Sequence, residues 1–175
     1  LAVDRIAAWL GLGRDAAAAS TEVVVLPYLD GERTPNLPNA AASITGLRHA
    51  TQAGEILLAA YQGAALSLLE ALEVIDTHSS GIDPGAPLLL IGGGAQGATW
   101  RRVVRALSGR PIQIPDATEL VALGGAAQAA AVLAGGAPEE IARRWGTSRG
   151  TVLGPVERAV HTVEHIREVR ARLAG

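Results

Sequence analysis

The chain has 175 residues and contains no cysteine, methionine, phenylalanine or lysine, so all 15 of its basic residues are arginines. Without a thiol, disulfide frameworks, zinc ribbons and cysteine nucleophiles are excluded, and without a lysine amine so are Walker A loops and Schiff-base chemistry. Seventeen acidic residues give a net charge of −2 and leave no basic stripe for nucleic acid, while a 49% hydrophobic content is sufficient for a packed core.

The first residue is leucine rather than methionine. We therefore expect the chain to be processed or cut from something longer. A chain without cysteine fits the reducing cytoplasm. A secretory signal would begin with a positively charged stretch followed by an apolar block, and the sequence does not begin with this pattern. The sequence thus predicts a cytoplasmic protein.

The first half of the chain combines helical spacing of apolar residues with short β-branched runs. Residues 1–13 carry one apolar face and predict a short amphipathic helix. The Val-Val-Val-Leu run at 23–26, stopped by Pro27, predicts a buried strand. The other expected elements of this half are an ordered loop at 30–39, a short strand at 43–47 and the longest helix at 51–75, with Thr51 as its N-cap.

The second half alternates apolar runs with helical patterns, which indicates an α/β fold. The helix expected at 119–133 is so rich in alanine and glycine that we expect another element to lie almost against its backbone. Beyond Asp116 the pattern predicts only helices and turns. The expected elements are strands at 88–91 and 112–114, helices at 99–107 and 119–133, a short helix from Pro138 and a last amphipathic helix beginning near Pro155.

The sharpest local pattern is a glycine-rich turn at 92–97, which follows an apolar strand and precedes a helix. Glycines there let backbone N–H groups approach a ligand without side-chain obstruction. The pattern is formally G-x-G-x-x-G, and Asp116 follows at the spacing of a ribose-binding acid in a dinucleotide unit. Such a unit needs further strands, so a nucleotide site of another α/β type is favoured, with a purely structural turn as the alternative.

Three other patterns favour structural interpretations. His161, Glu164 and His165 form an inverted zincin pattern, but only ten residues remain to supply a third ligand, so we expect solvated histidines. Residues 146–150, Gly-Thr-Ser-Arg-Gly, are expected to form a plain loop. The apolar stretch 120–137 is rich in small residues and favours close helix packing over a membrane span.

Asp30, Glu32 and Arg33 form a charged cluster on the expected ordered loop, where functional residues are often found. They are candidates for an interdomain or substrate loop. A salt bridge that merely orders the turn explains them equally well.

Four segments, in order along the chain, resemble signatures of the FGGY family of carbohydrate kinases. Residues 26–35 are similar to the P-Y-L-x-G-E-R-T-P segment of its xylulokinase branch, and residues 42–62 resemble the second family signature. Residues 92–95 with Trp100 and Arg101 resemble the adenosine motif, and residues 121–126 resemble the second connecting motif. The resemblance covers roughly residues 21–135.

This resemblance implies an actin-like, ribonuclease-H-like ATPase domain, an α/β fold with a mixed sheet flanked by helices, which forms the C-terminal half of a two-domain kinase. Gly93, Gly94, Ala95, Gly97 and Ala98 would then bind nucleotide, lying beside the adenine and ribose of ATP.

The resemblance also implies a division of the chain. Residues 1–20 would be an N-terminal helix and linker, 21–137 the nucleotide-binding domain and 138–175 a helical tail packed on it. The helix from Leu120 would pack near the interdomain hinge, and Asp116 would be structural. The catalytic aspartate and the Mg²⁺ ion would belong to an N-terminal kinase domain, so no catalytic residue or metal ligand is expected in this chain.

The implied reaction is ATP-dependent phosphorylation of a ketose, D-xylulose to D-xylulose 5-phosphate, with no activity expected of this chain alone. The alternatives are a glycerol, gluconate or ribulose kinase of the same family, a non-catalytic nucleotide-binding scaffold, or a dinucleotide-binding unit. No nucleic-acid or membrane partner is expected. Faces that the missing half would cover should favour self-association into homo-oligomers.

Overall fold

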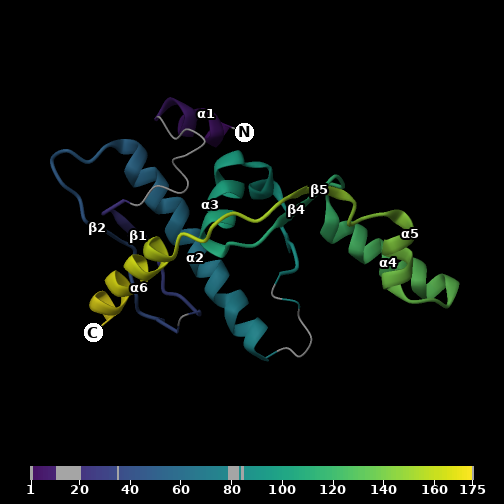
Figure 1. Ribbon diagram of the computed structural model, residues 1–175. Helices are drawn as coiled ribbons and strands as arrows, with labels where there is room; N and C mark the ends of the chain where they lie inside the picture. Colours follow the sequence, from purple (N-terminus) through teal and green to yellow (C-terminus); the bar gives the residue numbers. More distant parts are fainter. Residues whose placement is uncertain (1, 11–20, 35, 79–82, 84, 175) are drawn as a thin grey trace.

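The computed structural model describes residues 2–10, 21–34, 36–78, 83 and 85–174. Helices and strands alternate along most of the chain, which confirms the expected α/β class (Figure 1). In chain order the elements are α1 (Ala2–Trp9), β1 (Val24–Leu26), β2 (Ser43–Thr45), α2 (Ala53–His78), β3 (Leu88–Leu89), the 3₁₀ turn η2 (Gly93–Gln96), α3 (Ala98–Ser108), β4 (Ile112–Pro115), α4 (Leu120–Ala134), α5 (Pro138–Trp145), β5 (Gly150–Leu153) and α6 (Val160–Ala174).

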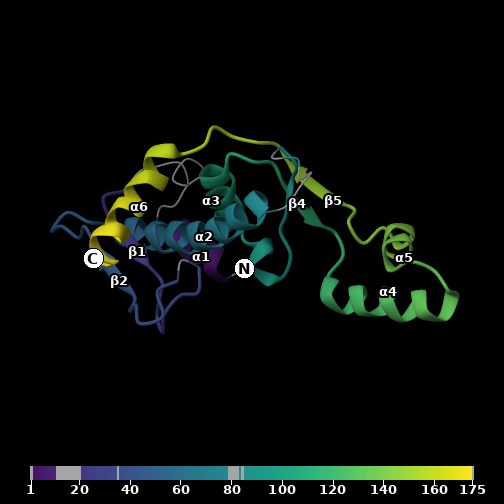
Figure 2. The ribbon, with the colours of Figure 1, turned by 90° about the horizontal axis from the view of Figure 1, so that it is seen from below.

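Helix α2 runs through the middle of the main body, with β1 and α3 packed on it (Figures 1 and 2). Gly63 permits the close approach to β1, because a Cβ there would lie 1.9 Å from the carbonyl oxygen of Val25. The helix begins two residues later than expected. Thr51 Oγ1 accepts a hydrogen bond from the Arg48 N–H at 2.8 Å, while Glu55 accepts one from the Gln52 N–H at 2.7 Å.

Two small sheets flank this helix. Strands β1 and β2 pair antiparallel, with Val24 opposite Thr45. The second sheet has the order β3-β4-β5 and is mixed, since β3 is parallel to β4 and β5 is antiparallel to it. The expectation of only helices and turns beyond Asp116 was therefore wrong: residues 150–153 form β5, because β4 offers a free edge to which this short, partly exposed segment can bond.

The core lies between α2, α3, β1, β4 and α6. Its most buried large side chains include Val24, Val103, Leu107 and Ile112. Helix α6 begins at Val160, five residues after Pro155, and contributes an apolar stripe to the same cluster. That stripe consists of Val163, Ile166 and Val169.

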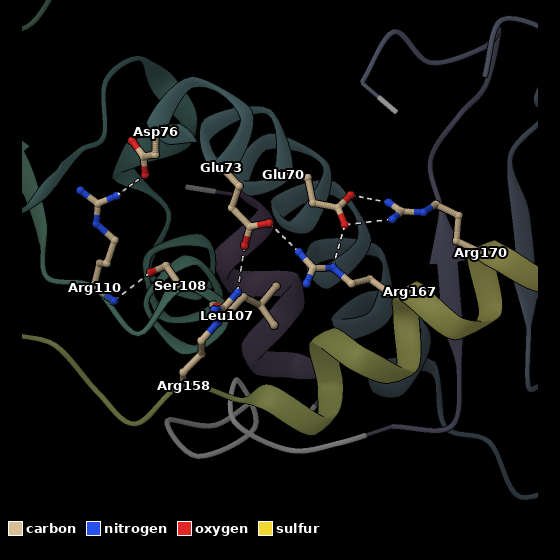
Figure 3. Close-up of polar contacts among 9 residues, drawn as sticks. All are labelled: Glu70, Glu73, Asp76, Leu107, Ser108, Arg110, Arg158, Arg167 and Arg170. Atoms are coloured by element: carbon tan, nitrogen blue, oxygen red, sulfur yellow. Dashed lines mark hydrogen bonds and ion pairs between the residues drawn. The ribbon is translucent and has the colours of Figure 1, made fainter. Parts of the chain in front are cut away.

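Polar contacts also fasten the C-terminal part of the chain to α2 (Figure 3). Glu70 accepts hydrogen bonds from Arg167 at 2.9 Å and from Arg170 through both guanidinium nitrogens. Glu73 accepts from Arg167 at 2.7 Å and from Arg158 at 3.1 Å. The hydrogen bonds to Glu70 raise the pKa of the Arg170 guanidinium above its usual range.

Helices α4 and α5 form an arm that projects away from the main body (Figures 1 and 2). Their contact is a small cluster of Ala127, Ala131 and Ile141. The expectation that another element lies against the small residues of α4 was wrong at Gly124 and Gly125, where a Cβ would meet no described atom within 4 Å. A composition rich in small residues shows that a helix can pack closely against another element. It does not show which segment of the chain packs there.

By length and composition, α2 could cross a membrane, and so could α4 with α5 if the pair, bent by 119°, counted as one span. Buried helices of soluble proteins have the same properties. Glu70 and Glu73 of α2 form ion pairs with arginines of the same protein, which favours packing within the protein.

Candidate functional site

The glycine-rich segment forms a tight turn between β3 and α3. Gly92 adopts φ 83°, a left-handed conformation that favours glycine. The turn is closed by hydrogen bonds from the Ala95 N–H to the Gly92 carbonyl at 3.1 Å and from the Gly97 N–H to the Gly94 carbonyl at 3.0 Å. A Cβ at Gly92, Gly93 or Gly94 would meet no described atom within 4 Å. This backbone surface is therefore open to a ligand.

Side chains behind the turn hold it in place. Arg101 donates to the Ala95 carbonyl at 2.5 Å and to the Gln96 side-chain oxygen at 3.1 Å. Asp4 of α1 accepts a hydrogen bond from the Thr99 N–H at 3.5 Å, in the first turn of α3. Burial raises the pKa of the nearby Tyr61 phenol, and the negative charge of Asp4 raises it further.

A pocket of about 500 Å³ opens beside the turn. One wall is the turn itself, with Ile91, Gly92, Gly93 and Gln96, and the facing wall is the segment 117–121 that starts α4. Thus β3 and β4, which are parallel neighbours, deliver both walls from their carboxyl ends, the edge at which α/β folds bind ligands.

The five predicted nucleotide residues lie in one turn but differ in exposure. Gly93 lines the pocket and Gly94 is exposed beside it. Ala95 and Gly97 are buried, Ala95 beneath the turn and Gly97 as the N-cap of α3, and Ala98 is the exposed first residue of that helix.

Sequence reasoning missed the facing wall. The sequence predicted a helix from residue 119 and a connecting motif at 121–126 but no part of a binding pocket there, although Thr118 and Glu119 line the pocket. Glu119 adopts φ 51° and ψ 40°, the only positive φ at a non-glycine residue in the described part of the chain. This conformation costs an ordinary residue about 1–2 kcal/mol. No sequence signal indicated it, because the conformation is imposed by the path from β4 into α4.

In the part of the chain that the structure describes, the pocket lining has one acidic side chain, Glu119, and no arginine or histidine. With open glycines on one side and hydroxyl or carboxylate oxygens on the other, it fits a planar, hydroxyl-bearing group better than a phosphate chain. The described residues contain no group of three His, Asp or Glu side chains that could hold a metal ion. The lining is therefore suited to a planar, hydroxyl-bearing part of a ligand.

The loop with Asp30, Glu32 and Arg33 is ordered by backbone contacts. The Glu32 carboxylate accepts hydrogen bonds from the Arg33 N–H at 2.7 Å and the Thr34 N–H at 3.3 Å, and Glu32 pairs with Leu37 through two backbone bonds. Among the described residues no salt bridge joins these three side chains. Glu32 therefore orders the turn through backbone N–H groups, while Asp30 and Arg33 are exposed.

A second hollow, of about 520 Å³, lies between this loop and the end of α6. Its polar lining residues are Tyr28, Asn36, Asn39, Ser43 and Arg170. It includes none of the predicted nucleotide residues, and Arg170 is already paired with Glu70. The glycine-turn pocket is therefore the better candidate site.

The remaining sequence patterns resolve structurally. His161 is fully exposed and lies 3.8 Å from Glu164. His165 differs from the solvated histidine that was expected, because its Nε2 is buried and has no hydrogen-bond partner among the described residues. In the Gly-Thr-Ser-Arg-Gly segment, Gly146 ends α5 in a left-handed conformation and Gly150 begins β5.

A glycine turn and a pocket at the carboxyl ends of parallel strands are typical of α/β domains that bind a ligand. Residues 8–133 match the model of the FGGY family of carbohydrate kinases, C-terminal domain. The chain belongs to this family, which confirms the resemblance found in the sequence.

Relatives named xylulose kinase match nearly the whole chain. Identity is 57% over 170 residues with the protein of Streptomyces coelicolor and 54% over 169 residues with that of Streptomyces rubiginosus, covering 97% of this chain in each case. The Escherichia coli xylulose kinase is 32% identical over 133 residues, 75% of this chain. The chain spans only about a third of the length of these relatives, 35% for both Streptomyces proteins.

Solved structures share the fold. A xylulose kinase from Bifidobacterium adolescentis, 31% identical, aligns over 96% of this chain and 34% of its own with a TM-score of 0.62. A Plasmodium falciparum glycerol kinase with ADP aligns over 96% of this chain and 33% of its own with a TM-score of 0.74 at 17% identity. The expected fold, the C-terminal domain of an FGGY kinase with a mixed sheet, is confirmed.

Proposed function

We propose that this chain is the nucleotide-binding half of an ATP-dependent kinase that phosphorylates D-xylulose to D-xylulose 5-phosphate. The observation that carries the proposal is the open glycine turn beside a pocket of about 500 Å³, in a chain 57% identical to a protein named xylulose kinase. The glycerol and gluconate kinases among the structural neighbours are 17% and 23% identical, so they support the fold and not another sugar.

In this proposal the chain binds and orients ATP. The backbone of Gly93 and Gly94 lies along the nucleoside, with Ala95, Gly97 and Ala98 forming the floor of the turn and the start of α3. The Mg²⁺ ion, the aspartate base and most sugar contacts belong to an N-terminal domain, which closes on this one. Phosphoryl transfer depends on positioning both substrates in line, so the chain alone is expected to be inactive.

We further propose that the apolar face of α4 lies near the hinge with that N-terminal domain, and that the loop with Asp30, Glu32 and Arg33 faces the closing cleft. Residues 1–20, 21–137 and 138–175 would form the linker, the nucleotide-binding domain and a tail packed on it. Its substrate ATP and its lack of cysteine favour action in the cytoplasm.

The first test is turnover by the complete polypeptide that contains this chain, with ATP and D-xylulose, in an assay coupled to ADP formation. Activity with D-xylulose well above that with glycerol, gluconate or ribulose is expected. Sugar-dependent turnover by the 175-residue chain alone would contradict the proposal that the catalytic groups belong to an N-terminal domain. Tight NAD binding would favour the dinucleotide alternative.

A Gly93→Val variant tests the site. Its Cβ would enter space that is open in the protein, so folding is preserved while the backbone approach is blocked. We expect KM for ATP to rise about tenfold or more, a free-energy change of about 1.4 kcal/mol. Gly154→Val is the matched control, since a Cβ there also meets no described atom within 4 Å but lies outside the pocket. An unchanged KM for Gly93→Val would refute the placement.

A further inference from the structure

Glu119 keeps a conformation that glycine or asparagine would adopt more readily. Its φ of 51° lies in the left-handed region, at the residue that caps the N-terminus of α4. Helix caps at this position normally contribute a side-chain acceptor to the first turn, but the Glu119 side chain makes no cap hydrogen bond. Helix α4 therefore receives no side-chain cap hydrogen bond from Glu119.

The Glu119 carboxylate has no other partner within the described ranges of the chain: it takes part in none of the ion pairs or side-chain hydrogen bonds found there. It does line the glycine-turn pocket, on the wall that faces Gly92 and Gly93. An unpaired acid thus faces an open backbone surface across a space large enough for a ligand.

The rest of the lining determines which part of a ligand an acid could bind. Among the described residues, Gln96 and Thr118 are the other polar side chains of the lining, which includes no arginine or histidine. A carboxylate repels phosphate groups, but its two oxygens accept hydrogen bonds from a pair of adjacent hydroxyls. In a nucleoside triphosphate the only such pair is the 2′ and 3′ hydroxyls of the ribose.

We propose that Glu119 binds the ribose hydroxyls of the nucleotide and makes the kinase selective for ribonucleotides. The proposal rests on the function proposed above. The glycine turn then contacts the other face of the nucleoside, and the phosphates extend out of the pocket. The dinucleotide interpretation of the sequence pointed to Asp116 as the ribose-binding acid. In this proposal the ribose-binding acid is instead Glu119, three residues further along the chain.

The test compares ATP, 2′-deoxyATP and 3′-deoxyATP as phosphoryl donors for the complete kinase. Glu119→Gln keeps the size of the side chain and removes its charge, whereas Glu119→Gly removes the side chain and fits the positive φ. Glu139→Gln changes an exposed acid of α5 in the same arm, outside the pocket lining, and is the matched control.

We expect wild type and Glu139→Gln to prefer ATP over either deoxynucleotide by tenfold or more in kcat/KM. Glu119→Gly should lower this preference to less than twofold, through a higher KM for ATP with little change in KM for the sugar, and Glu119→Gln should fall between. Thermal unfolding should show Glu119→Gly at least as stable as wild type, because the strained backbone is relieved.

A Glu119→Gly enzyme that keeps its preference for ATP, or a wild type without one, would overturn the assignment of Glu119. A wild type that transfers no phosphoryl group to any sugar would instead overturn the proposed function. The two failures are therefore distinguishable in one set of assays.

Discussion

Gly63 and Gly124 both lie inside helices, but their surroundings differ. At Gly63, α2 packs so closely against β1 that a Cβ would lie 1.9 Å from the Val25 carbonyl oxygen. Gly124 of α4 has no described atom within 4 Å of the same position. One glycine is required by a contact, and the other only loosens its helix in this chain.

Alanine at these two positions should therefore change stability in opposite directions. Gly63→Ala should lower the free energy of unfolding by about 1–3 kcal/mol or more, through forced displacement of α2 from β1. Gly124→Ala should raise it by about 0.5–1 kcal/mol, through helix propensity. Urea titration followed by circular dichroism measures both. Equal effects of the two substitutions would contradict the close contact at Gly63.

At the level of single residues, the sequence predicted the glycine turn better than the pocket around it. The run of glycines after an apolar strand is a local pattern, so Gly93 and Gly94 could be found by inspection. The place of Glu119 in the pocket lining could not, because it depends on the left-handed backbone at that residue and on the glycine turn across the pocket. Neither the backbone conformation nor the position of the facing turn can be predicted from the residues next to Glu119.

At the level of elements, α6 is held by both packing and charge. Val163, Ile166 and Val169 enter the core, and Arg167 and Arg170 reach carboxylates on α2. Glu70 is the more buried acceptor, with 12% of its side chain exposed against 46% for Glu73. Loss of the Glu70 carboxylate would leave Arg170 without its acidic partner, while Arg167 would keep its ion pair with Glu73.

Glu70→Gln should therefore lower the free energy of unfolding by about 2–3 kcal/mol, since removal of the carboxylate leaves the mostly buried Arg170 charge unpaired. Glu73→Gln is the matched control on the next turn of the same helix, and because its carboxylate is half exposed it should cost about 0–1 kcal/mol. Thermal or urea unfolding at low and high salt measures both, and the Glu73 effect should fade further in salt. A larger loss for Glu73→Gln would contradict the assigned order.

Elements with strong local patterns were predicted, whereas β5, which forms by pairing with β4, was not. The run at 23–26 has three β-branched residues and a proline stop, and β1 forms there as a buried strand. Residues 150–153 have a mixed composition and are partly or fully exposed. They become β5 because β4 supplies hydrogen bonds from a segment more than thirty residues away in the sequence.

For the whole molecule, the most prominent feature is the exposed apolar surface of the arm. Val121 and Val132 are each 83% exposed and Leu133 is 89% exposed, and α4 contains no charged residue. Contiguous apolar surface of this kind favours association. In the isolated chain, this face of α4 should therefore become buried against another copy of the chain.

We therefore expect the isolated 175-residue chain to self-associate as its concentration rises, with a Val132→Glu, Leu133→Glu double variant shifted toward monomer. Charges placed on the exposed face of α4 should oppose burial without disturbing its contact with α5 through Ala127 and Ala131. Sedimentation velocity over a range of concentrations measures the shift. Val156→Glu, on the extended segment before α6, is the control and should leave association unchanged; equal behaviour of all variants would contradict a role for the arm.

The pairing of Pro115 with Gly150 has a consequence for how this domain can vary. These two residues are direct partners in the β4–β5 ladder, so the arm leaves and re-enters the body at a single point, as an insertion in a β-hairpin does. Such an insertion can be exchanged between relatives as one piece, because both of its ends already lie side by side. The segment 117–121 would travel with the exchanged piece while the glycine turn stayed behind. Chimeric proteins built at this junction would inherit one wall of the glycine-turn pocket from each parent.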